Sequence, residues 1–68
     1  MAINKVKLYR MELGITQGEL AKRVEVSRQT ISLIESNKYN PSINLCIKIC
    51  ECLNKTLNDL FWEVKYDE

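Results

Sequence analysis

Apolar side chains recur at helical spacing from the beginning of the 68-residue chain. The first apolar stripe ends just before Gly14, and glycine is favoured after a helix C-terminus because it takes a positive φ at little cost. The pattern therefore predicts a first helix over about residues 5–13. The residues that recur at helical spacing in it are Val6, Tyr9 and Leu13, with Arg10 among them.

Two further helices are predicted in quick succession. Thr16 and Glu19 have the spacing of a capping box, in which each side chain bonds the other residue's backbone N–H, and this indicates a second helix over about 17–24. Ser27 is the next capping residue, and a third helix is predicted over about 28–36. About three residues separate the two helices.

Proline occurs once, at position 41, in a polar segment that must end the third helix because the residue before a proline disfavours α conformation. Ser42 then caps a fourth predicted helix. A fifth short helix begins at Thr56, where Asp59 completes a second capping box. The inner face of the fourth helix comprises Leu45, Cys46, Ile49, Cys50 and Leu53, and the fifth helix carries Leu57, Leu60 and Phe61.

The segment from Phe61 to Tyr66 alternates and is rich in aromatic and β-branched residues, which predicts a strand over about 62–66. Its candidate partner is the segment 1–4, and the alternative is a frayed tail. The predicted fold is a single all-α domain over residues 1–68 with five helices and a small two-stranded antiparallel pairing of the N- and C-termini.

Composition removes several classes of function. The chain is 46% hydrophobic and 28% charged, which is typical of a folded globular domain, and it has no histidine. Hydrolases that use Ser/His or Cys/His pairs and zinc proteases are therefore excluded, and we expect no enzyme activity. No stretch approaches the roughly 20 apolar residues of a membrane span, and the N-terminus lacks the pattern of a signal peptide, so we expect a cytoplasmic protein.

The three cysteines fall within seven residues, at positions 46, 50 and 52. Their spacing matches no zinc-binding pattern, and one helix cannot bridge 46 to 50 without strain. We interpret them as reduced thiols that serve as small apolar residues. No metal and no cofactor is expected.

Net charge is only +1, but the charges are unevenly distributed. Residues 1–41 carry seven basic and four acidic side chains, whereas residues 42–68 carry three basic and five acidic ones. A polyanion would therefore face the N-terminal part of the chain. Chance imbalance among solvated side chains is the alternative.

The third predicted helix has two unlike faces. At 100° per residue, Ile31 and Ile34 point inward, and the opposite face carries no carboxylate. Arginine and glutamine make bidentate hydrogen bonds to guanine and adenine edges, so this face suits a DNA major groove; a plain polar surface is the alternative. The outer face comprises Arg28, Gln29, Ser32 and Ser36, with Leu33 beside them.

The segment 16–35 has the residue types of a helix-turn-helix in order, and the chain resembles the XRE, or Cro/cI-like, family of helix-turn-helix repressors over residues 5–61. The resemblance implies a five-helix, lambda-repressor-like DNA-binding domain. It is carried by Thr16-Gln17, Leu20-Ala21, Val24, Val26-Ser27, Arg28-Gln29-Thr30-Ile31, Ile34-Glu35, Lys38, Asn40-Pro41-Ser42 and Leu60-Phe61.

Several roles follow from this resemblance. Arg28 and Gln29 are the expected base-reading residues, and Arg10 and Glu35 are expected to form a partly buried ion pair that is structural. Glu25 stands where the family usually has glycine, so a positive φ is expected there. The expected DNA-contacting set is Gln17, Ser27, Arg28, Gln29, Thr30, Ser32, Leu33, Lys38 and Asn40, although helix capping alone also explains Ser27.

The expected function is sequence-specific binding of double-stranded DNA by a homodimer on a palindromic operator. The homodimer is expected to regulate transcription as a repressor. No small-molecule effector is evident. The alternative is a protein-interaction module, such as an antitoxin or accessory subunit, with the same fold. Apolar side chains near the C-terminus exceed what a small core encloses, and they are the expected dimer interface: Leu57, Leu60, Phe61, Trp62 and Val64. The alternative is that Trp62 and Phe61 fold back over the core of the monomer.

Overall fold

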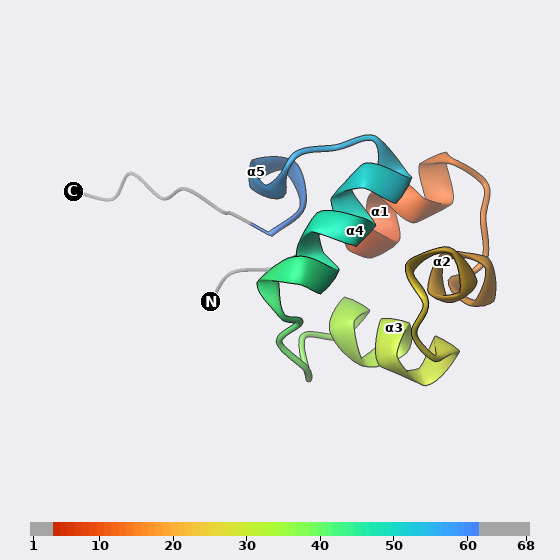
Figure 1. The fold of residues 1–68 in the computed structure, drawn as a ribbon. Coiled ribbons are helices and arrows are strands. Elements are labelled where there is room, and N and C mark those ends of the chain that lie inside the picture. Colours follow the sequence, from red (N-terminus) through yellow and green to blue (C-terminus); the bar gives the residue numbers. More distant parts are fainter. Residues whose placement is uncertain (1–3, 62–68) are drawn as a thin grey trace.

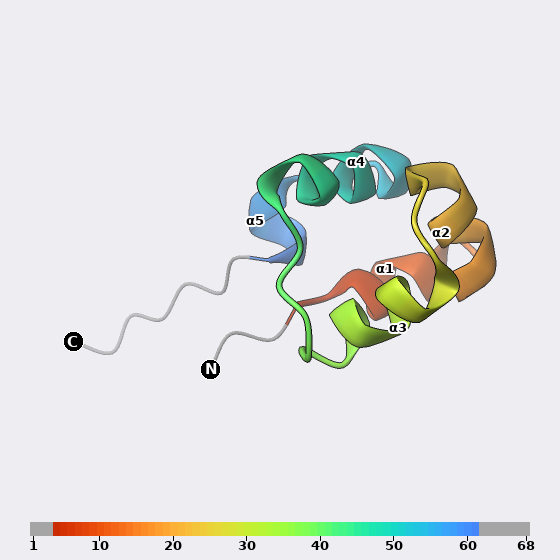
Figure 2. The ribbon, with the colours of Figure 1, turned by 60° about the horizontal axis from the view of Figure 1, so that its bottom comes forward.

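The computed structural model describes residues 4–61, and in this part of the chain all regular secondary structure is helical (Figures 1 and 2). The predicted bounds of the first three helices differ from the observed ones by at most one residue at either end. The all-α, five-helix prediction is confirmed for this part of the chain. In order, the helices are α1 (Val6–Glu12), α2 (Gln17–Val24), α3 (Arg28–Glu35), α4 (Ile43–Leu53) and α5 (Leu57–Leu60).

Side-chain caps fix where four of the helices begin. Each cap residue accepts a hydrogen bond from the backbone N–H three residues further on, which satisfies one of the free donors of a helix N-terminus. The predicted capping boxes at the starts of α2 and α5 are both complete. The four caps are Thr16, Ser27, Ser42 and Thr56.

The core is an apolar cluster to which all five helices contribute. In it α2 packs against α3 and α4, α1 contacts α3 and α4, and α5 contacts α4. The prediction that Leu13 ends the first helix on its inner stripe was wrong: α1 ends at Glu12, and Leu13 is 50% exposed. The largest fully buried side chains are Leu20, Ile31, Ile34, Ile49, Leu53, Leu60, Val6 and Val24.

The predicted pairing of the termini falls mainly on residues 1–3 and 62–66, outside the described residues, and it stays a prediction. Asn4 and Phe61, which are described, are not in a strand. One backbone hydrogen bond does join the two ends of the described chain, from the Lys5 N–H to the Leu60 carbonyl at 2.8 Å. The start of α1 therefore lies against the end of α5.

All three cysteines are free thiols, and two of them are buried in the apolar stripe of α4. Burial raises the pKa of the Cys46 and Cys50 thiols above the ordinary value of 9.0, because a thiolate is poorly solvated there. These side chains therefore act as small apolar residues.

The structure also bears on membrane insertion. No helix between residues 4 and 61 is long and apolar enough to cross a bilayer.

Candidate nucleic-acid interface

A tight turn sets the position of α3 relative to α2. Glu25 ends α2 in the left-handed conformation, with φ 65°, so the positive φ expected from the resemblance is present. The Val26 N–H then donates to the Ala21 carbonyl at 2.9 Å, and Ser27 caps α3. A non-glycine residue in this conformation costs about 1 kcal/mol. The turn holds the two helices in the helix-turn-helix arrangement.

The two faces of α3 differ as the sequence pattern predicts. Ile31 and Ile34 are fully buried, whereas the opposite face is open to solvent and polar. Glu35 is the carboxylate of this helix, and its side chain is only 4% exposed because it points inward. Thr30 is half-buried and bonds Ser27. The exposed side chains are Arg28, Gln29, Ser32, Leu33 and Ser36, all free of negative charge.

Polar side chains connect this open face to the interior. The Arg10 Nε donates to the Glu35 Oε2 at 2.7 Å, and the two side chains are 10% and 4% exposed, so the expected ion pair is present and buried. The Gln17 Nε2 donates to the other Glu35 oxygen at 3.0 Å. The Gln17 Oε1 in turn accepts from the Arg28 Nη1 at 3.4 Å. This chain of hydrogen bonds orients Gln17 and Arg28 side by side at the start of the open face.

The loop after α3 begins with a Schellman motif, in which two backbone N–H groups return to the last turn of the helix. The Asn37 N–H donates to the Ile34 carbonyl at 3.0 Å, and the Lys38 N–H donates to the Leu33 carbonyl at 2.9 Å. Asn37 has φ 62°, in the left-handed region. The motif leaves Lys38 and Asn40 exposed beyond the C-terminal end of α3.

Sequence reasoning missed two residues beside α3. Asn4 hydrogen-bonds both Ile34 and Asn37, contacts that span about thirty residues of sequence and leave no local signal. Lys7 of α1 lines a polar hollow together with Gln17, Ser32, Glu35 and Ser36. In the sequence, Lys7 is marked only as one of the seven basic residues of the segment 1–41. Lys7 thus adds a cation at the edge of the open face.

The predicted dimer residues do not behave alike. Leu60 is only 1% exposed and packs in the core, so its assignment to an interface was wrong: the four-residue α5 uses it to cover α4. Leu57 is 37% exposed and Phe61 is half-buried. The predicted contributions of Trp62 and Val64 lie outside the described residues.

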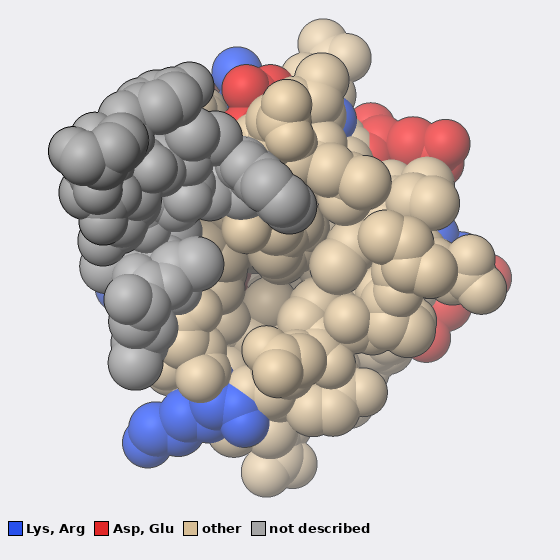
Figure 3. Space-filling model, turned by 90° about the vertical axis from the view of Figure 1, so that its left-hand side faces the viewer, with Lys and Arg blue, Asp and Glu red and all other residues tan. Residues whose placement is uncertain are grey.

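Two apolar side chains of α4 are more exposed than those of α5. Ile43 is 62% and Ile47 is 42% exposed. The side of the molecule that carries α5 and the start of α4 has few charged residues on its visible described surface (Figure 3). Exposed apolar side chains on a weakly charged surface are typical of protein contacts rather than of nucleic-acid contacts.

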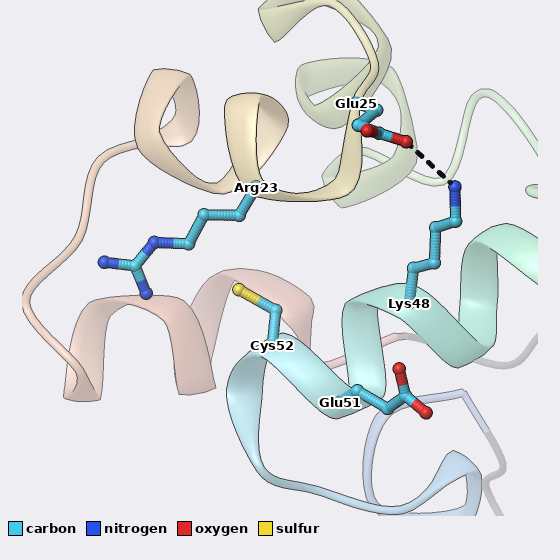
Figure 4. A pocket seen from close by; sticks show the side chains of 5 residues that line it. All are labelled: Arg23, Glu25, Lys48, Glu51 and Cys52. Atoms are coloured by element: carbon cyan, nitrogen blue, oxygen red, sulfur yellow. Dashed lines mark hydrogen bonds and ion pairs between the residues drawn. The ribbon is translucent and has the colours of Figure 1, made fainter.

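The hollow between the end of α2 and α4 is lined by charges of both signs, unlike the open face of α3 (Figure 4). Arg23 and Lys48 are balanced there by Glu25 and Glu51, and the Lys48 Nζ lies 3.3 Å from the Glu25 Oε1. Its charges therefore favour neither an anion nor a cation. Within residues 4–61, no group of acidic and thiol side chains is placed to hold a metal ion.

Comparisons with known proteins agree with this arrangement. The helix-turn-helix family model matches residues 6–60. An uncharacterized HTH-type transcriptional regulator of Methanocaldococcus jannaschii is 47% identical over 58 residues, which are 85% of this chain and 88% of the relative. The antitoxin HipB of Escherichia coli is 39% identical over 54 residues, 79% of this chain and 57% of HipB. The solved N-terminal DNA binding domain of SinR from Bacillus subtilis is similar with a TM-score of 0.76 and 31% identity, over 94% of this chain and 91% of that domain.

Proposed function

This chain belongs to the XRE-type helix-turn-helix family, and from that premise we propose that it binds double-stranded DNA in a sequence-specific manner and represses transcription as a homodimer. The observation that carries the proposal is the outer face of α3, which is exposed, polar and free of carboxylates. A helix with such a face fits the major groove, where base edges present hydrogen-bonding groups that differ for each base pair.

In this proposal, the first turn of α3 reads the bases. Arg28 recognises guanine through its forked N–H groups, and Gln29 recognises adenine. Ser32 contacts a base edge one turn further on, and Leu33 supplies an apolar contact for a thymine methyl group. The hydrogen bond from Arg28 to Gln17 supports this role, because a side chain held in place loses less entropy on binding.

The remaining residues contact the DNA backbone on either side of the groove. The Gln17 amide uses one N–H on Glu35 and keeps a second N–H for a phosphate oxygen, next to the N-terminus of α2. Ser27, the cap of α3, and Thr30, in its first turn, contact the DNA backbone at the start of this helix. Lys38 and Asn40 extend beyond its end and contact phosphates there. Such contacts fix the register of the helix on the duplex without reading sequence.

A homodimer would place two copies of α3 on one side of the assembly, about 34 Å apart, so that each enters a successive major groove of a palindromic operator. The exposed apolar side chains of Ile43 and Ile47 on α4 and Leu57 on α5 support an interface on this part of the molecule. Bound at a promoter, the dimer would exclude the transcription machinery and act as a repressor.

Selection of bound duplexes from a random DNA pool tests this proposal. We expect a palindromic consensus, tight binding of that consensus, and a binding constant that falls steeply with salt because phosphate contacts release counterions. Sedimentation at micromolar concentration should give a dimer near twice the 8.0 kDa mass of the chain. Failure to enrich any sequence, together with weak binding at low salt, would contradict the function.

A second candidate is a protein-interaction module, which the similarity to the antitoxin HipB favours. Leu8 and Met11 on α1 are 52% and 60% exposed, and the proposed DNA contacts leave them unused. Binding to a protein partner would depend weakly on salt, whereas duplex binding would depend on it strongly. Comparison of the two salt slopes separates the candidates.

A further inference from the structure

Asn4 precedes α1 in sequence but lies against the far end of α3. Its Nδ2 donates to the Ile34 carbonyl at 2.6 Å and to the Asn37 Oδ1 at 2.9 Å. Its Oδ1 accepts from the Val6 N–H at 3.2 Å, at the first turn of α1. Both amide hydrogens and one oxygen lone pair are therefore used. The reversed amide would place its oxygen against the Ile34 carbonyl oxygen and its nitrogen against the Val6 N–H, so these two backbone groups fix its orientation.

These partners belong to the loop that carries two proposed DNA contacts. Ile34 and Asn37 are two members of the Schellman motif that ends α3, and Lys38 is the next residue. The Ile34 carbonyl accepts from both the Asn37 N–H and the Asn4 amide. Because Asn37 has a positive φ that only a few residue types adopt readily, an extra bond to its side chain favours this one loop conformation.

We propose that Asn4 is a positioning residue for DNA binding: it clamps the Schellman motif and thereby aims Lys38 and Asn40 at the phosphate backbone. The inference rests on the proposed function, since it assigns a role within the same interface. Asn4 itself touches no DNA in this scheme. Asn4 reduces the number of conformations that the loop with Lys38 adopts in the free protein. Less conformational entropy is therefore lost when Lys38 binds a phosphate.

The variant Asn4→Ser tests the clamp without a change of charge. A serine hydroxyl can still accept from the N–H two residues further on, as the Asn4 Oδ1 accepts from Val6, but serine is too short to donate to Ile34 and Asn37. Two hydrogen bonds are lost, to Ile34 and to Asn37, and we expect operator affinity to fall at least about two- to tenfold, which is the value of one of them. Asn58→Ser, the same change at an exposed position of α5, is the matched control and should leave affinity unchanged.

A double-mutant cycle with Lys38→Ala separates positioning from a general structural effect. If Asn4 acts through Lys38, Asn4→Ser should lose most of its effect on affinity once Lys38 is absent. Equal fold-losses in the two backgrounds would overturn the proposal, because a loss of folded protein lowers binding by the same factor in each. Circular dichroism at the binding temperature should show every variant folded.

A second variant approaches the clamp from the other side. Asn37→Gly keeps the left-handed turn, which glycine adopts freely, but removes the oxygen that accepts from Asn4. We expect it to weaken operator binding in the same direction and to make a further Asn4→Ser change less costly. Wild-type affinity for both Asn4→Ser and Asn37→Gly, with salt-dependent binding by the wild-type protein intact, would overturn the clamp and leave the proposed function standing. Absence of wild-type binding would instead refute the function itself.

Discussion

The outer faces of α3 and α4 are both exposed, but they differ in chemistry. The α3 face presents Arg28, Gln29 and Ser32, which hydrogen-bond to water and would exchange those bonds for base edges. The α4 face presents Ile43 and Ile47, which gain only by removal from water. Two faces of one small domain are therefore suited to different partners.

The difference also shows how each face is supported. Beneath the α3 face lies the buried pair of Arg10 and Glu35, which is linked through Gln17 to Arg28. The buried side of α4 itself consists of Ile49, Leu53 and the thiols of Cys46 and Cys50. Directional hydrogen bonds hold a reading surface in one geometry, whereas an apolar contact surface needs only shape.

The largest effect should come from Arg10→Met, which removes the support of the α3 face. It leaves the Glu35 carboxylate buried without its cation, and loss of one partner of a buried pair costs about 3–5 kcal/mol of unfolding free energy. Urea denaturation followed by circular dichroism measures this loss. The double variant Arg10→Met, Glu35→Leu should recover much of it, because an apolar pair needs no compensating charge. A loss below about 1 kcal/mol in the single variant would contradict the buried pair as an essential support.

Gln29→Ala should disturb reading alone. We expect it to lose about 1–3 kcal/mol of discrimination at one or two base pairs, while binding to scrambled DNA changes little. Competition assays with operator and scrambled duplexes measure the difference. Equal weakening on both duplexes would mean that Gln29 contacts the backbone rather than a base.

Ile47→Ala should produce the opposite pattern on the α4 face. Self-association should weaken about tenfold, since a half-exposed isoleucine buried at an interface is worth roughly 1–2 kcal/mol. The base preferences of the protein should be unchanged. Analytical ultracentrifugation and repeated sequence selection check the two halves of this expectation. A dimer constant equal to that of the wild type would move the interface away from α4.

Lys7→Gln should weaken binding to all duplexes modestly, because Lys7 borders the hollow beside Ser32 and Ser36. The slope of log binding constant against log salt should become shallower by about 0.9, the contribution of one phosphate contact. Lys48→Gln is the matched control, since Lys48 pairs with Glu25 in the hollow between α2 and α4. Identical slopes for the two variants would exclude Lys7 from the interface.

The smallest effect concerns α5, which covers α4. The Thr56 N–H and hydroxyl hold the pKa of the Asp59 carboxyl below its ordinary value of 3.8. A lowered folded-state pKa gives stability that is present above pH 3.8 and lost as the pH falls through the folded-state value. Thermal unfolding of Asp59→Asn and wild type should therefore differ at neutral pH and converge in acid. A constant difference across that range would mean that the carboxylate charge is not involved.

Local signals predicted most of this fold. Thr16, Ser27, Ser42 and Thr56 each cap the helix that follows, because a cap bonds a backbone group only three residues away and needs no tertiary context. The two faces of α3 were equally accessible from periodicity. The positive φ of Glu25 was expected from the family resemblance, since its position usually holds glycine.

Long-range features were not accessible in this way. Leu60 looked like surplus apolar surface, and only the packing of α5 on α4 shows that it belongs to the core. Leu13 fitted the helical stripe, but the helix ended one residue earlier and left it exposed. The contacts of Asn4 join residues about thirty positions apart, and nothing in the local sequence marks an asparagine for that role.

The bond from the Lys5 N–H to the Leu60 carbonyl has a consequence for synthesis. A ribosome makes α1 first, and Leu60, whose carbonyl accepts from the residue before α1, is translated only after α2, α3 and α4 have been made. Until then, Val6 lacks part of its apolar cover, since α5 closes the same cluster. Stalling or truncation before Leu60 should therefore leave a chain that contains α3 but lacks a closed core, and such a chain should be cleaved by proteases faster than the complete one.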